Sequence, residues 1–181
     1  MAHQRKLIRD AIVLRLLQAG TLAERRVFGS RAAPLQPKEL PALLVYTKSE
    51  QVEISNVAPQ EFKRTLTVSL ELVAQSDREE TLDDLLDEFA FQVEKSIFSD
   101  QYFDDLVSEC VLGDTDIEIL SDGEKPIGAV KINLLITYFQ RLPADDSSDG
   151  FDDFLKIGTK VDLPTADGSF ENDDLVDIPQ S

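Results

Sequence analysis

The sequence predicts an α+β fold: a mixed, mainly antiparallel sheet with two helices packed on one face, followed by an extended acidic C-terminal arm. Three observations support this prediction. The chain of 181 residues is long enough to bury a core. Its periodic segments follow the order helix, strands, helix, strands up to residue 142. Residues 143–181 show no sustained period of either kind.

The first helix is expected over residues 4–18. Apolar residues recur at helical spacing from Leu7 to Leu17, and they occupy much of the helix circumference. Gly20 is placed to end the helix. So broad an apolar stripe suggests that the helix is covered on more than one side, by its own sheet and by another subunit.

Two long connections surround the first predicted strand. Residues 19–41 are rich in glycine, proline and arginine, and a compact domain rarely keeps so long a loop without a function. The apolar run 40–47 predicts a strand that is covered on both faces. Residues 48–61 are polar and predict a loop with a short strand around 52–54. Residues 62–74 alternate apolar and polar side chains, which is typical of a half-buried strand.

The second helix is expected to begin near Ser76 and to end at Ile97. Ser76 and the residue after it each have a glutamate three residues later, which is the spacing of a capping box. A further helical turn is predicted around 104–110, and the last strands around 111–119 and 129–138.

Net charge divides the chain into unlike parts. The whole chain carries −17. Residues 1–40 hold 8 basic and 3 acidic side chains (+5), residues 41–142 hold 8 and 21 (−13), and residues 143–181 hold 2 and 11 (−9). A protein this acidic does not grip nucleic-acid phosphates or anionic lipid by charge. Two interpretations stay open: the cationic end binds the anionic body of another copy, or the charges only keep the surface solvated.

Side chains that usually carry catalysis are scarce. His3 is the one histidine, so a histidine triad or a multi-histidine metal site is excluded. Cys110 is the one cysteine, lies among apolar residues with no nearby cation, and is expected to be a packed thiol. No glycine-rich nucleotide-binding motif occurs. We therefore predict no catalytic, cofactor-binding or metal-binding residue, and a protein that is not an enzyme.

One calcium-like pattern occurs in the acidic arm. Asp145, Ser147, Asp149 and Gly150 match positions 1, 3, 5 and 6 of an EF-hand loop. Position 12 is Lys156, where a bidentate glutamate is required, and a proline interrupts the helix that would lead into the loop. A flexible acidic linker is the better interpretation.

Several stretches together resemble one family. These are the opening helix around 7–12, the loop 26–31 followed by the strand 39–46, the alternating strand 66–72 and the closing strand 132–138. The strongest part is Leu-Pro-Ala-Leu-Leu-Val-Tyr within 39–46. Together they resemble the tail terminator proteins of long-tailed bacteriophages, the minor tail protein U-like family, over roughly residues 4–140.

The resemblance implies a structural virion protein. Such a protein forms a hexameric ring on the last ring of tail tube protein, stops further polymerisation, and presents the surface that joins the neck or head-completion protein. DNA passes through the ring without specific binding. The resemblance places the protein at the head-proximal end of the tail, after assembly in the host cytoplasm, and no membrane is among its partners.

Two groups of residues are candidates for contacts in such an assembly. The two connections 19–41 and 48–61 are expected to carry subunit and tube contacts. Basic residues of the first connection are the candidate contact residues, with plain solvated residues as the alternative. They are Arg25, Arg26, Arg31 and Lys38. Apolar residues of the arm are candidates for docking it on a neighbour. They are Phe151, Phe154, Leu155, Phe170, Leu175 and Ile178.

The predicted organisation is therefore a tail-terminator-like domain over 1–142 and an acidic arm over 143–181. Two other functions stay open at this point. One is a different head–tail joining or tail-completion protein. The other is an acidic, DNA-mimicking or chaperone-like binding protein whose arm is the working part. Deletion of the arm distinguishes a tail terminator from such a binding protein. A terminator core still forms rings without the arm, whereas the binding protein loses its activity.

Overall fold

The computed structural model describes residues 3–120, 125–141, 156–161 and 172–177. Contacts within the chain divide it into two units, Met1–Leu142 and Pro143–Ser181, and each is described by itself. Among the described residues, no helix is both long enough and apolar enough to cross a membrane.

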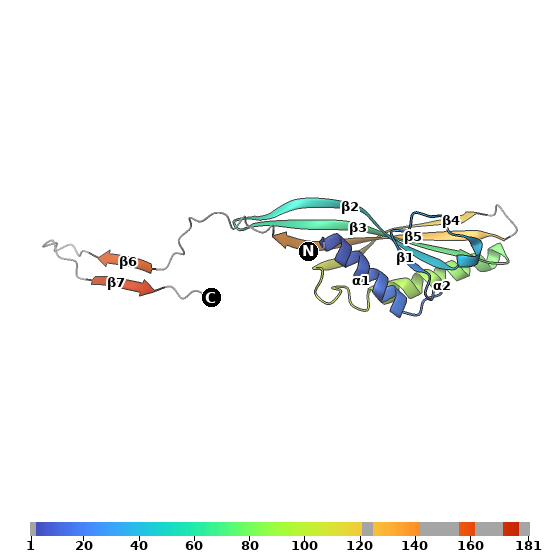
Figure 1. Ribbon diagram of the computed structural model, residues 1–181, viewed down its shortest axis with the longest axis horizontal. Helices are drawn as coiled ribbons and strands as arrows, with labels where there is room; N and C mark the ends of the chain where they lie inside the picture. The colour runs from blue at the N-terminus through green and yellow to red at the C-terminus, as the bar shows by residue number, and fades with distance from the viewer. Residues whose placement is uncertain (1–2, 121–124, 142–155, 162–171, 178–181) are drawn as a thin grey trace. The chain divides into compact units, whose positions relative to one another are not determined.

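The first unit is a five-stranded sheet with two helices on one face (Figure 1). Its elements are α1 (Gln4–Gln18), β1 (Val27–Gly29), the 3-10 helix η1 (Pro37–Glu39), β2 (Ala42–Val57), β3 (Gln60–Gln75), α2 (Glu79–Ile97), β4 (Glu109–Leu120) and β5 (Ile127–Arg141). The strand order is β1-β2-β3-β5-β4, with β1 parallel to β2 and every other pairing antiparallel. The predicted fold class, a mixed and mainly antiparallel sheet under two helices, is confirmed.

The core lies between the sheet and the helices. Alternate residues of the central strands face it, because successive side chains of a strand point to opposite faces. In β3 these run from Leu66 to Ala74 and in β5 from Val130 to Tyr138, and all of them are buried. The helices contribute residues at steps of three and four. They are Ile8, Ile12 and Leu16 from α1, and Leu82, Leu86, Phe89, Val93 and Ile97 from α2.

The two helices begin in different ways. The His3 side chain caps α1 by accepting a hydrogen bond from the Arg5 backbone N–H at 3.2 Å, and Gly20 follows the helix with φ +65°. The capping box expected at Ser76 does not form. The chain is still extended at Arg78, so the Ser76 hydroxyl lies outside the helix and pairs with that of Thr81 at 2.6 Å instead.

The largest difference from prediction is the stretch 48–61. It is not a loop with a short strand: it completes β2 and begins β3, and the two strands of 16 residues form one long hairpin. Its residues pair as far as Val57 with Gln60 although most are exposed. Backbone hydrogen bonds to the neighbouring strand hold this polar sequence extended. Such bonds leave no apolar periodicity in the sequence.

Two smaller predictions also differ. The long connection 19–41 contains β1 and η1, and only the pairing of β1 with β2 makes its three residues a strand. The helical turn expected around 104–110 is a set of turns over 101–106, and Cys110 belongs to β4.

The second unit contains a two-stranded antiparallel sheet, β6 (Lys156–Val161) and β7 (Asn172–Asp177). The sequence shows no sustained period here and predicted neither of these two strands. Their register places Lys156 opposite Asp177 and Lys160 opposite Asp173. Strand partners distant in sequence are not visible to a search for local periodicity.

Candidate assembly surfaces

The outer half of the β2–β3 hairpin is an exposed projection of the sheet. It extends past the N-terminal end of α1 (Figure 1), and every residue of β2 from 51 to 57 is exposed. Val52, Ile54 and Val57 are 48%, 63% and 81% exposed. Val52 and Ile54 lie on the same face of the strand as the buried Val45, since they pair with Arg64 and Phe62 on the core side of β3. We call residues 51–64 the hairpin tip.

A buried ion pair joins the hairpin tip to the core. The Glu50 carboxylate, whose side chain is 8% exposed, accepts hydrogen bonds from Arg64 Nη1 at 2.7 Å and from the Tyr138 hydroxyl at 2.5 Å. Arg5 Nε of α1 lies 4.0 Å from the same carboxylate. Burial raises the pKa of Glu50, but the bonds from Tyr138 and Arg64 outweigh it, so the pKa lies below its ordinary value. The cluster thus fixes the direction in which the hairpin leaves the domain.

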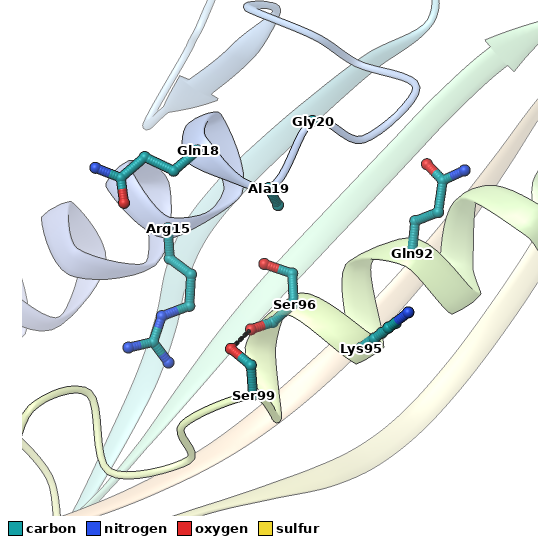
Figure 2. Close-up of a pocket in the computed structure, with 8 residues that line it drawn as sticks. All are labelled: Arg15, Gln18, Ala19, Gly20, Gln92, Lys95, Ser96 and Ser99. Atoms are coloured by element: carbon teal, nitrogen blue, oxygen red, sulfur yellow. Dashed lines mark hydrogen bonds between the residues drawn. The ribbon is translucent and has the colours of Figure 1, made fainter.

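A hollow of about 620 Å³ lies between the C-terminal halves of α1 and α2. It is open and is lined mainly by small and polar groups; Figure 2 shows Gln18 from α1 opposite Gln92 and Lys95 from α2. Arg15 is already bound, to the Asp100 carboxylate at 2.8 Å and to the ring of Phe103 at 4.3 Å. The described residues that line the hollow form no catalytic arrangement.

Two of the four basic candidates stabilise their own loop. Arg31 binds both oxygens of Glu39 at 2.9 and 2.8 Å and lies 4.7 Å from the ring of Phe28. The hydrogen bond to Glu39 raises the pKa of Arg31. Arg26 donates to the Pro41 carbonyl oxygen at 2.7 Å. These two guanidinium groups shape the connection 19–41.

The other two candidates, Arg25 and Lys38, are exposed. Neither makes a side-chain hydrogen bond or an ion pair with the residues that the structure describes. Their ammonium and guanidinium groups are therefore open to a partner, and they remain candidates for contacts with another protein.

Cys110 is buried in the core, and His3 caps a helix. Cys110 is 3% exposed, and burial raises the pKa of its thiol to about 11, while the charge of Arg15 acts in the opposite direction. The expectation that no cation lies near Cys110 is thus wrong, although the thiol is buried. His3 is the cap of α1.

Other candidates cannot be placed. The calcium-like residues Asp145, Ser147, Asp149 and Gly150 lie outside the described residues, as do five of the six arm-docking residues. The sixth, Leu175, belongs to β7. Within the described part of the chain, no three metal-binding side chains are grouped closely enough to hold an ion.

The sequence predicted contacts for the stretch 48–61, but not which of its side chains form the exposed apolar surface of the hairpin tip. One signal was present, because Val52 and Ile54 alternate with polar neighbours as in a strand. Their exposure depends on where the helices end, and the sequence of the hairpin itself does not contain that information.

Comparison with known proteins identifies a family for this chain. The sequence profile described as "Phage minor tail protein U" matches residues 3–138. No curated protein matches the sequence. Among solved structures, a chain from "Virion of native gene transfer agent (GTA) particle" is 10% identical, with 72% of this chain and 94% of that chain covered and a TM-score of 0.36. Because the family profile covers most of the chain, the protein belongs to the phage minor tail protein U family and is a structural component of the phage tail in the virion.

Proposed function

We propose that the protein forms a hexameric ring on the end of the phage tail tube, ends tube polymerisation, and provides the interface for joining the head or neck. The hairpin tip carries this proposal, because it presents Val52, Ile54 and Val57 to solvent at one end of the domain. Exposed apolar residues gathered on one projection mark a protein-binding surface. Its occupant is the tail tube protein.

The remaining surfaces suit the other contacts of a ring. The exposed Arg25 and Lys38 are available to a neighbouring subunit or the tube, whereas Arg26 and Arg31 hold their own loop. The net charge of −17 favours a channel through which DNA slides without specific binding. The ring lies at the head-proximal end of the tail and performs no catalysis.

The acidic segment 143–181 acts as an arm that reaches a neighbouring subunit, the tube or a neck protein. Its apolar residues Phe151, Phe154, Leu155, Phe170, Leu175 and Ile178 are the docking groups in this proposal. Removal of 143–181 leaves ring formation intact, because the core described above lies within residues 3–141. Loss of tube capping with the arm would favour an acidic binding protein instead.

The experiment is tube growth from the purified tail tube protein of the same phage, with and without this chain. We expect added protein to be found at tube ends in electron micrographs and to shorten the tubes in proportion to its concentration. Rings of six are expected at those ends. Tubes of unchanged length, or protein bound along their sides, would contradict the proposal.

A further inference from the structure

The helix layer does not cover the whole sheet. α1 packs over β1 and β2, and α2 packs over β3 and β5. Neighbouring strands are about 4.8 Å apart and a helix is about 10 Å wide, so two helices cover about four strands. The fifth strand, β4, lies at the edge of the sheet beyond β5. Its face on the helix side is therefore bare.

That bare face is apolar. Leu112, Ile117 and Ile119 pair with Leu134, Val130 and Gly128, whose positions face the helices. The three β4 side chains are 43%, 55% and 40% exposed, although their partners on β5 are buried. We call this strip with the adjoining flank of α2 the β4 slot.

One wall of the β4 slot is acidic. α2 turns its Gln92 flank toward the end of α1, where the Gln92 side-chain oxygen accepts from the Leu22 N–H at 2.9 Å. Its opposite flank, with Asp83, Asp87 and Glu94, therefore faces β4. α2 contains seven acidic residues and one lysine, so the acidic wall of the slot is this flank of α2. Asp116 and Glu118 of β4 alternate with Ile117 and Ile119, so they lie on the opposite face of the sheet and do not line the slot.

α1 carries the matching surface. Ile8, Ile12 and Leu16 face its own core, but Leu7, Leu14 and Leu17 form a second row that is 41%, 55% and 39% exposed. The row runs along one side of the helix, since its members are seven and three residues apart. With four basic residues and one acidic residue, α1 is the most positive element of the chain.

Lys6 and Arg9 border the leucine row. Both lie near Asp10, with Arg9 Nε at 3.9 Å. Arg9, Leu14 and Leu17 also line one shallow hollow of about 400 Å³ with Gly29 of β1. Asp10 lies between Leu7 and Leu14 on the same side of the helix and lines the same hollow, so the row is an apolar strip with one acidic residue inside it and a cationic border. It lies at the end of the sheet away from β4.

We propose that the β4 slot of one copy binds the outer leucine row of α1 of the next copy. Both surfaces are apolar, neither has a partner among the described residues, and their borders carry opposite charges. Because the two surfaces differ and lie at opposite ends of the sheet, the contact is head-to-tail. Repetition of such a contact builds a ring when the rotation between copies closes, and an open filament when it does not. The inference rests on the proposed ring and identifies its lateral contact.

Reversal of charge on each surface tests this contact. The variant Lys6→Glu/Arg9→Glu makes the border of the leucine row negative, like that of the slot. The variant Asp83→Lys/Asp87→Lys makes the α2 border of the slot positive, like that of the leucine row. Each is expected to weaken self-association at low salt by at least about tenfold in sedimentation velocity, since like charges at an interface are strongly unfavourable. The variant with all four changes restores association.

A mixture gives the sharpest result. The two reversed variants, each defective alone, are expected to associate when mixed in equal amounts, because each supplies the surface that the other needs. Such complexes alternate, so they contain an even number of subunits, and six is allowed. The matched control is Asp84→Lys/Glu88→Lys, which changes the charge of α2 equally but at exposed positions away from the flank that faces β4, and leaves association intact.

The outcomes separate this inference from the proposed function. A wild-type chain that stays monomeric at all accessible concentrations, or associates without regard to the reversals and their rescue, overturns the inferred contact. Tube capping measured on the same samples tests the proposed function independently. Association restored in the mixture without any effect on tube length would keep the contact and contradict the terminator function. If the reversed variants self-associate normally but no longer cap tubes, the slot binds the tube protein or the arm, and the inferred contact between copies is wrong.

Discussion

The two halves of the β2–β3 hairpin have the same backbone pairing but opposite environments. Ala42–Val45 of β2 lie in the core, while residues 51–57 of the same strand are exposed. Burial of apolar area stabilises the inner half, whereas the outer half depends on its ladder and on the Glu50 cluster at its base. Folding energy and the proposed binding surface thus occupy different ends of one element.

The largest effect is expected in the inner half and its helices. Phe89→Ala removes a fully buried ring from α2 and should lower the free energy of unfolding by about 3–5 kcal/mol. Ile54→Ala at the hairpin tip, where the side chain is 63% exposed, should change it by less than about 0.5 kcal/mol. Denaturant melts of both variants measure the two changes in the free energy of unfolding. Similar changes would contradict the division of the hairpin into a stabilising inner half and a binding outer half.

A second prediction concerns the base of the hairpin. Glu50→Gln should cost about 2–3 kcal/mol, because it leaves the part-buried Arg64 guanidinium without its carboxylate partner. The folded-state pKa of Glu50 lies below its ordinary value of 4.5, so its contribution is present above that value. It is lost as the pH falls through the folded pKa.

The control for this prediction is Glu53→Gln, the same change at an exposed position on the opposite face of the strand. It should leave stability unchanged at every pH. Melts at pH 7 and at steps below pH 4.5 should show the gap between wild type and Glu50→Gln closing as acid is added. A gap that persists at the lowest pH would mean that packing, and not charge, supports the cluster.

A third, smaller effect is expected where a helix touches the sheet. A Cβ added at Gly128 of β5 would lie 2.5 Å from Leu86 Cδ1 and 3.2 Å from Leu82 Cδ2 of α2. Gly128→Ala should therefore cost about 1–2 kcal/mol by overpacking. Gly29→Ala, whose nearest contact is 3.4 Å, is the matched change on β1. Equal thermal stability of the two variants would show that α2 moves freely over the sheet.

Local signals in the sequence predicted the helices and the core strands well. α1 begins at a capping His3 and ends before Gly20, so its bounds agree with the expected 4–18. The alternation of 62–74 predicted the buried face of β3 because side chains there obey the period of two. The sequence contains these features within a few residues of one another.

Features that depend on distant partners were not predictable in this way. β1 is a strand only because β2 lies beside it, and Arg31 is unavailable to a neighbour only because Glu39 folds back on it. The exposure of Ile117 on β4 depends on how many strands two helices can cover. Each requires the tertiary arrangement, which no local pattern contains.

The smallest effect on stability should accompany the largest effect on assembly. Ile54→Asp adds a charge to a side chain that is 63% exposed, so the free energy of unfolding should change by less than about 0.5 kcal/mol. The same charge would be buried against the tube, so capping in the tube-growth experiment should be lost. Gln51→Asp adds the same charge on the opposite face of the hairpin tip and should leave capping intact. If both variants cap tubes normally, the apolar face of the hairpin tip does not contact the tube, and that contact must lie on another surface of the domain.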